Sequence, residues 1–289
     1  ITASPFIYWI SDDFRQKFTH NVLDDSIKVA QGLATGDNSR FLRYWWEIDS
    51  NDREILESWV PYAKGGKFNK WAGNLWLRVN WVNNGYAIKN FTDSNGKLRS
   101  RPQNEKFYFE EGITYSASGR GGYAFRTLPS GSIFDVGGSS MFPVKSFKNT
   151  SYVLAFLNSK LVFYIANCLN PTANIQVGDL QRVPFLVPKK EDELFVTKLA
   201  EENIQLTKEI LTFDFFEDSY ESSGLIKFND KGRSIIQVAA LFTEYVISKK
   251  VIILINEYLI NNRVFEIYNL NNYDKELVIN DQGTDVCNF

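Results

Sequence analysis

The sequence predicts an α+β fold in which a mixed, β-rich unit over residues 1–188 is followed by an α-helical appendage over residues 189–289. Two observations carry this prediction. Short apolar runs separated by glycine- and asparagine-containing turns fill the middle of the chain, which is typical of strands joined by tight connections. After Pro188, apolar residues recur at helical spacings over long stretches, which is typical of amphipathic helices.

The first sixty or so residues combine a short helix with extended segments. A helix is predicted over Asp12–Phe18, and Ser11 or Asp12 is its predicted N-cap. The stretch from Ile27 to Ile48 alternates short apolar runs with turn residues, so we expect strand–turn–strand there rather than helix.

The middle of the chain, between Pro61 and Pro143, has the alternating pattern of a sheet. The predicted strands are Trp76–Trp81, Tyr86–Asn90, Ile113–Ser116, Ala124–Leu128 and Ile133–Val136. Their connections contain turn residues, as in Asn83-Asn84-Gly85. A buried helix over Ser151–Cys168 and a short strand over Arg182–Val187 complete the β-rich unit.

The helical appendage contains three predicted helices. They span Glu191–Leu211, Ser234–Tyr245 and Val251–Tyr268. The first carries an apolar stripe at spacings near 3.5, interrupted at Asn203.

Composition limits the class of protein. With 289 residues, 44% of them hydrophobic, the chain can bury a sizeable core. Its two cysteines, Cys168 and Cys287, are too few and too far apart for a disulfide framework, so we expect a reducing cytoplasm. Polar residues interrupt the most apolar stretches, so no membrane span is predicted. Because the chain starts at Ile1 and ends in a polar run, we expect a piece of a longer protein, and a processed or trimmed chain would look the same.

Charge is distributed unevenly along the chain. The net charge is −2, yet residues 64–126 hold eleven Lys and Arg against four Asp and Glu. Residues 189–289 hold eleven against eighteen and are acidic. A basic middle third is consistent with a surface that faces a polyanion, and scattered surface lysines would explain it equally well.

Motifs for catalysis are missing from the sequence. His20 has no second histidine or nearby cysteine with which to share a metal, so no zinc site is expected. Neither a nucleophile elbow nor a phosphate-binding glycine loop occurs. An amino-methyltransferase acting on DNA needs Asn or Asp followed by two prolines and an aromatic residue, and Asn170-Pro171-Thr172 lacks the last two. We therefore expect no catalytic site, metal or cofactor in this chain.

Basic residues interleaved with aromatic and glycine residues suggest DNA binding. They occur in Arg40–Trp46, Lys64–Trp71 and Arg99–Asn104. Lysine and arginine neutralise phosphates, and arginine reads guanine through two hydrogen bonds. Gly119-Arg120-Gly121-Gly122 fits a flexible loop at a phosphate and fits a plain hairpin loop equally well. The candidate DNA contacts are Thr35, Asn38, Arg40, Lys64, Lys67, Lys70, Arg99, Arg101, Arg120 and Arg126. If they act together, Lys70, Arg101 and Arg126 should line one basic cleft.

An ordered series of motifs carries a family resemblance over nearly the whole chain. The series includes Gln31–Phe41 with Trp45-Trp46-Glu47 behind it, Pro61–Trp71, Ile133–Gly138, Leu169–Pro184 and Asn262–Leu270. It resembles the recognition region of the PglX family, the adenine-specific DNA methyltransferases of BREX phage-defence systems. The strand predicted at Val183–Pro188, leading into a long helix, is similar to type I restriction specificity subunits.

The resemblance implies a division of labour. In this family the part that binds S-adenosylmethionine and flips the base lies N-terminal to the recognition region, so the cofactor is expected in a catalytic domain that this chain lacks. That domain would methylate adenine N6, while the present region would select the sequence and hold double-stranded DNA. The expected partners are therefore DNA and the catalytic domain of the same parent chain.

A second hypothesis is a protein-interaction module. Here the acidic helical region would dock other subunits of the defence system, or an acidic DNA-mimicking phage protein would capture the basic face. The apolar stripe of Glu191–Leu211 fits docking, although packing onto the chain's own core explains it more simply.

Overall fold

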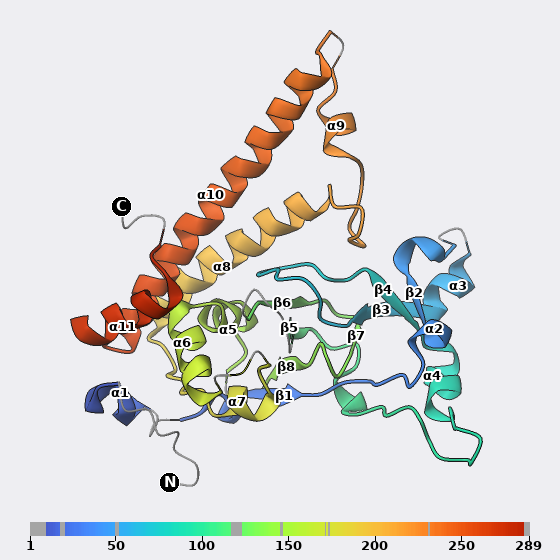
Figure 1. Cartoon of the computed structure of the whole chain (residues 1–289), viewed down its shortest axis with the longest axis horizontal. Helices are drawn as coiled ribbons and strands as arrows, with labels where there is room; N and C mark the ends of the chain where they lie inside the picture. The colour runs from blue at the N-terminus through green and yellow to red at the C-terminus, as the bar shows by residue number, and fades with distance from the viewer. Residues whose placement is uncertain are drawn as a thin grey trace.

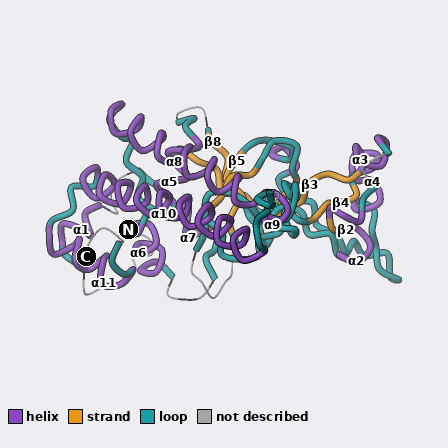
Figure 2. The backbone as a smooth tube through the Cα atoms, turned by 90° about the horizontal axis from the view of Figure 1, so that it is seen from above, coloured by secondary structure: helices purple, strands orange, loops and turns teal. Residues whose placement is uncertain are grey.

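The computed structural model describes residues 10–17, 21–49, 52–116, 123–144, 147–170, 172, 174–230 and 232–285. Two small sheets and a set of helices make up the molecule, which confirms the α+β class. Figure 1 shows the first sheet near the centre, the second towards one end, and the C-terminal helices rising above them. In Figure 2 the second sheet again lies at the end of the molecule opposite to α6 and α11.

The first sheet is antiparallel and has the strand order β1-β8-β5-β6. Its strands are β1 (Ile27–Ala30), β5 (Gly112–Tyr115), β6 (Phe125–Leu128) and β8 (Ser140–Pro143). All four residues of β5 are buried. Buried central strands of this kind need apolar or small side chains on both faces, and this sheet packs into the larger of two hydrophobic cores.

The second sheet has the order β2-β4-β3-β7 and packs on the smaller core, which also contains Ala30, Leu128 and Phe142 from the first sheet. Its strands are β2 (Leu42–Tyr44), β3 (Trp59–Ala63), β4 (Leu77–Asn80) and β7 (Ile133–Phe134). The β3–β7 pair is parallel and the other pairs are antiparallel. The basic middle third of the sequence therefore contributes strands to both sheets.

Short helical segments precede, connect and follow the strands. They are α1 (Asp12–Gln16), η2 (Leu23–Asp25), α2 (Asn38–Phe41), η3 (Trp45–Glu47), α3 (Arg53–Ser58), α4 (Val82–Lys89), η4 (Glu105–Phe107) and α7 (Val177–Gln181). Ser11 caps α1, because its hydroxyl accepts a hydrogen bond from the Phe14 N–H at 2.9 Å, as predicted.

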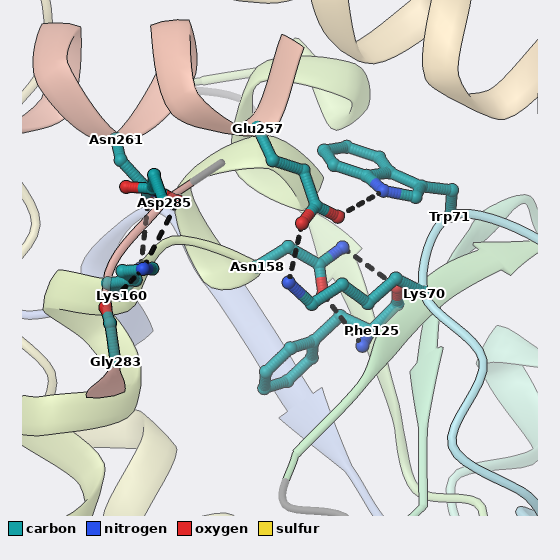
Figure 3. Close-up of polar contacts among 9 residues, drawn as sticks. All are labelled: Lys70, Trp71, Phe125, Asn158, Lys160, Glu257, Asn261, Gly283 and Asp285. Atoms are coloured by element: carbon teal, nitrogen blue, oxygen red, sulfur yellow. Dashed lines mark hydrogen bonds and ion pairs between the residues drawn. The ribbon is translucent and has the colours of Figure 1, made fainter. Parts of the chain in front are cut away.

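The predicted buried helix at residues 151–168 is two helices, α5 (Thr150–Leu157) and α6 (Lys160–Leu169), bent by 64°. The break has a physical cause. The side-chain amide of Asn158 accepts from Phe125 N–H at 3.1 Å and donates to Phe125 C=O at 2.9 Å, so it extends the edge of β6 (Figure 3). Ser159 then caps α6.

The C-terminal region consists of α8 (Lys190–Leu211), α9 (Gly224–Lys227), α10 (Ile235–Ile267) and α11 (Asn272–Gln282). The prediction of α8 is confirmed. The two helices predicted at residues 234–245 and 251–268 are one continuous helix, α10, because Ser248-Lys249-Lys250 between them contains no helix breaker. Helices α8 and α10 run in opposite directions along each other (Figure 1).

The helical region shares the larger core with the first sheet. Val196 and Ala200 of α8, and Ile260 and Val264 of α10, are buried in the same cluster as the side chains of α5 and α6. The change at Pro188 is therefore a change of secondary structure, and the hydrophobic core continues across it.

The predicted strands have mixed outcomes. Those at residues 76–81, 113–116, 124–128 and 133–136 are confirmed as β4, β5, β6 and β7. The bounds of β4, β6 and β7 are shorter than predicted and those of β5 are shifted by one residue, whereas β3 and β8 were not predicted. The strand predicted at residues 86–90 is wrong, because these residues continue α4 after a left-handed turn at Asn83, Asn84 and Gly85. No strand forms at residues 182–187, where Pro184 makes only an isolated bridge to Val22. Between β1 and β2 the chain inserts α2, so residues 27–48 are not a simple strand–turn–strand.

Within the described ranges, no single helix is long and apolar enough to cross a membrane. The bent pair of α5 and α6 meets the criteria of length and composition when its two helices are taken together, and most of its side chains are buried in the larger core.

Candidate nucleic-acid interface

A loop after β1 positions the first group of candidate contacts. The Leu33 N–H donates to the Phe134 carbonyl at 2.8 Å. At Gly32 a Cβ atom would lie 1.8 Å from that carbonyl oxygen, so only glycine lets the loop lie this close to β7. Ala34 and Arg101 then exchange two backbone hydrogen bonds of 3.0 and 2.8 Å. Segments more than sixty residues apart are thereby brought side by side.

Residues 35–38 form a turn that leads into α2. Thr35 is buried and its hydroxyl donates to Asn38 Oδ1 at 2.8 Å, whereas Asn38 is exposed. Asp37 caps α2 by accepting from the Arg40 N–H at 3.1 Å and the Ser39 hydroxyl at 2.7 Å. These hydrogen bonds, and then the charge of Arg99, hold the pKa of the Asp37 carboxyl below its usual value.

Three exposed arginines gather beside this turn, and we call Arg40, Arg99 and Arg101 the arginine cluster. The guanidinium groups of Arg40 and Arg99 both lie over the ring of Phe91, at 5.2 and 5.3 Å from its centroid. Among the described residues, no carboxylate forms an ion pair with any of the three. Guanidinium groups held on a ring and exposed to solvent can bind phosphate or the edge of a guanine.

The loop after β3 carries the second group of candidates. Lys64 is half-buried, and its burial lowers the pKa of the ammonium group, an effect that Asp135 partly offsets. Lys67 is exposed, and its ammonium lies 5.0 Å from the ring centroid of Phe216. The Tyr62 hydroxyl at the end of β3 links this loop to the loop after β1. Its oxygen lies 2.6 Å from both the Leu33 carbonyl oxygen and Asp135 Oδ2.

Lys70 has a partner within the chain. Its ammonium forms an ion pair with Glu257 of α10 at 3.2 Å, and the same carboxylate accepts from Trp71 Nε1 at 2.8 Å (Figure 3). The side chain of Lys70 is only 19% exposed. In this conformation Lys70 binds the helical region rather than presenting a free charge.

Arg126 is also turned inward, and its side chain is one of the most deeply buried in the molecule. The residue is 1% exposed, and its guanidinium donates to Ser116 Oγ at 2.9 Å and to the carbonyls of Ala124 and Asn69 at 3.3 and 3.4 Å. Burial lowers the pKa of this guanidinium to about 10. The prediction that Arg126 contacts DNA is corrected to a structural role, because a buried guanidinium does not face a duplex.

The three cations expected to line one cleft therefore do not all present a free charge. Lys70 is paired with Glu257 and Arg126 is buried, and of the three only Arg101 is exposed without an ion-pair partner. Arg120 and His20 lie outside the described residues.

Three acidic residues that sequence reasoning missed bind the segment from Lys70 to Arg78. Glu217 is 3% exposed and accepts from the backbone N–H groups of Asn74 and Leu75 at 2.9 and 3.2 Å. Asp218 binds the Arg78 guanidinium through both oxygens at 2.7 and 2.8 Å. Glu257 is the third. The sequence shows that the C-terminal region is acidic, but it does not show which groups of the middle third these carboxylates bind.

Comparison with known proteins gives the following relatives. The chain is 33% identical over 232 residues to the adenine-specific methyltransferase PglX of Lacticaseibacillus casei (strain Zhang), which covers 76% of this chain and 19% of that protein. It is 32% identical over 229 residues to the adenine-specific methyltransferase BrxX of Escherichia coli O9:H4 (strain HS), covering 77% and 18%. No protein-family model matches the chain.

Among solved structures, the type IIL restriction-modification enzyme MmeI in complex with DNA superposes with a TM-score of 0.49 at 10% identity. That match covers 88% of this chain and 35% of the MmeI chain. The family assignment rests on the sequence relatives, of whose length the chain spans about one fifth. The chain belongs to the PglX/BrxX family of adenine-specific methyltransferases and is homologous to a segment of those proteins.

Proposed function

We propose that the chain is the sequence-specific DNA-recognition region of a PglX/BrxX-type methyltransferase that acts on adenine N6. Homology to these methyltransferases over three quarters of the chain supports the parent activity. The observation that carries DNA recognition is the arginine cluster, in which backbone pairing between Ala34 and Arg101 gathers three exposed cations from two segments.

The arginine cluster suits a duplex for physical reasons. Arg40 and Arg99 are held over one ring, so less side-chain entropy is lost when they bind than for freely rotating arginines. Exposed Asn38 lies two residues before Arg40 in α2, and its amide can read an adenine edge. In this proposal the cluster supplies base or phosphate contacts, and Lys64 and Lys67 add positioning charge.

Methyl transfer is assigned to the part of the parent protein outside this chain. S-adenosylmethionine would bind there, and the chain would contribute sequence selection without a catalytic residue of its own. The proposed partners are double-stranded DNA and that catalytic domain, and the proposed place of action is the cytoplasm.

Binding of the 289-residue chain to duplex DNA tests the proposal. Selection from a randomised duplex pool should enrich one motif, and fluorescence anisotropy should then give the affinity for that motif at several salt concentrations. Arg40→Gln combined with Arg99→Gln should weaken binding by about 1–3 kcal/mol per base contact, or lower the salt slope by about one unit per phosphate contact. Arg53→Gln is the matched control, because this exposed arginine is paired with Glu57 on α3.

Two results would contradict DNA recognition. One is equal affinity for the selected duplex and for heparin at every salt concentration. The other is a double variant that binds the duplex as tightly as the parent chain.

A second candidate function, docking of another defence-system subunit, is favoured by one specific observation. Within nine residues of α10, the aliphatic side chains of Ile247, Val251, Ile252, Leu254 and Ile255 are each at least 39% exposed. Removing everything after Pro188 would uncover the shared core, so Val251→Asn with Leu254→Asn is the better test. Docking predicts loss of the partner with duplex affinity unchanged.

A further inference from the structure

Three exposed aromatic rings and one half-buried ring, that of Trp46, lie together beside the second sheet, and we call Tyr44, Trp46, Phe215 and Phe216 the aromatic platform. The rings of Tyr44 and Trp46 are stacked, with centroids 4.6 Å apart and planes 3° apart. Phe215 lies on Trp46 at 5.2 Å and 30°, and Phe216 meets Trp46 nearly edge-on at 6.1 Å. Despite these contacts, Tyr44, Phe215 and Phe216 are 44%, 51% and 52% exposed.

The platform is built by two segments that are distant in sequence. Tyr44 and Trp46 come from β2 and η3, whereas Phe215 and Phe216 come from the connection after α8. The carboxylates of Glu217 and Asp218, directly after the two phenylalanines, bind the backbone of residues 74–75 and the Arg78 side chain. The exposed rings are therefore fixed in place before any ligand arrives.

A cation borders the rings. The exposed ammonium of Lys67 lies 5.0 Å from the Phe216 centroid, and Asn74 Nδ2 donates to the Lys67 carbonyl at 2.8 Å, which holds the loop against the platform. Flat rings beside a fixed positive charge match a strand of unpaired nucleotides, because bases stack on rings while phosphates attract cations. A purely apolar protein partner would leave the Lys67 charge without a counterpart.

We propose that the aromatic platform binds unpaired bases of single-stranded DNA, with Lys67 on the adjoining phosphate. The inference rests on the proposed function, in which the chain meets DNA that a methyltransferase must locally open to take a base out of the stack. The platform holds nucleotides that have lost their pairing, whereas the arginine cluster binds the paired duplex.

Fluorescence anisotropy with a labelled oligo(dT) strand of about twelve nucleotides tests the proposal on the 289-residue chain. Tyr44→Leu with Phe216→Leu should lower the affinity for this strand about tenfold or more, since each stacked base is worth about 1–3 kcal/mol. The affinity for the selected duplex should stay within about twofold. Tyr273→Leu is the matched control, because Tyr273 is 57% exposed on α11, at the opposite end of the molecule (Figure 2).

Lys67→Gln gives a second readout that leaves all four rings in place. It should reduce the salt slope of oligo(dT) binding by about 0.7 units, the value for one phosphate contact on a single strand. The proposal is overturned if the double variant binds oligo(dT) as tightly as the parent, or if it loses oligo(dT) and duplex binding equally. It is also overturned if the rings instead mediate self-association, seen as a dimer that the double variant abolishes.

These outcomes separate the two proposals. Loss of sequence selectivity on duplexes, with platform-dependent oligo(dT) binding intact, contradicts the proposed recognition function alone. Selective duplex binding without platform-dependent oligo(dT) binding contradicts this inference alone.

Discussion

Cations of the basic middle third and its neighbours divide into two groups with opposite surroundings. Lys70, Arg78 and Arg126 are bound to carboxylates or buried among carbonyl and hydroxyl oxygens. Arg40 and Arg99, in contrast, lie exposed on the ring of Phe91 without a carboxylate in ion-pair contact among the described residues.

For Lys70 and Arg78 the difference arises from the acidic C-terminal region, whereas Arg126 is surrounded by oxygens of Asn69, Ala124 and Ser116. Glu257 of α10 and Asp218 after α8 form ion pairs with Lys70 and with Arg78 of β4, whereas no carboxylate among the described residues forms an ion pair with Arg40 or Arg99. Overall charge near zero can therefore coexist with a locally basic surface, because the acidic region neutralises one part of the basic segment and leaves the other part available to a polyanion.

The largest expected effect on stability comes from replacing Arg126, the deeply buried cation of the first group. Arg126→Met should lower the free energy of unfolding by about 2–4 kcal/mol, because Ser116 Oγ and two carbonyls lose their donor in a buried site. Urea unfolding followed by circular dichroism measures it, with exposed Arg101→Met as the control. If Arg126→Met lowers the free energy of unfolding no more than Arg101→Met does, the distinction between buried, structural cations and exposed cations is wrong.

A smaller effect is expected at the contact between α10 and the loop of Lys70. Glu257→Gln keeps an acceptor for Trp71 Nε1 but loses the ion pair, so the free energy of unfolding should fall by about 1 kcal/mol. Because Lys70 is then released, the salt slope of duplex binding should steepen by about one unit. An unchanged slope in anisotropy titrations would show that Lys70 does not reach the duplex even when free.

The Phe91 ring, which lies beneath Arg40 and Arg99, should contribute to the affinity for the duplex but not to its salt dependence. Phe91→Leu removes the cation–π contact of Arg99 and one of the two of Arg40, which keeps its contact with Phe41, and it leaves both charges in place. Duplex binding should therefore weaken by about 0.5–1 kcal/mol with the salt slope unchanged. Phe107→Leu is a matched control, because Phe107 is a half-buried ring stacked on Phe142 in the same core. Equal effects of the two substitutions would mean that the ring acts through packing alone.

The smallest effect is a pH dependence. Burial raises the pKa of the Glu217 carboxyl above its usual value, although the N–H groups of Asn74 and Leu75 oppose the shift. The folded pKa exceeds the unfolded one, so the stability that this group contributes is fully present below the unfolded pKa and declines as the pH rises through the folded pKa. The difference in the free energy of unfolding between the wild-type chain and Glu217→Gln should therefore be greater at about pH 4 than at about pH 7.

Urea unfolding at several pH values measures this difference, with Glu221→Gln as an exposed control. A difference that grows with pH would contradict the assigned direction of the pKa.

Local patterns in the sequence were sufficient for much of the fold. The spacing of apolar residues predicted α8, and alternation predicted β4, β5, β6 and β7. Ordered motifs also indicated the PglX/BrxX relationship, which the comparisons confirm. Such features depend on neighbours within one element, so a single sequence contains them.

Local patterns failed where a distant contact decides the conformation. Asn158 ends α5 because Phe125, 33 residues away, offers both backbone groups to its amide. At residues 86–89 the cause is local instead: a left-handed turn at Asn83, Asn84 and Gly85 redirects the chain, and the residues after it form a helix although their pattern suggests a strand.

The sequence by itself determined the α+β class, the strong helix α8 and the concentration of positive charge in the middle of the chain. Only the tertiary structure decided which of those charges face solvent. The reason is physical: the free energy of a cation depends on the carboxylates, carbonyls and rings around it, and for Lys70 and Arg78 the carboxylates come from the C-terminal region, 187 and 140 residues further along the chain.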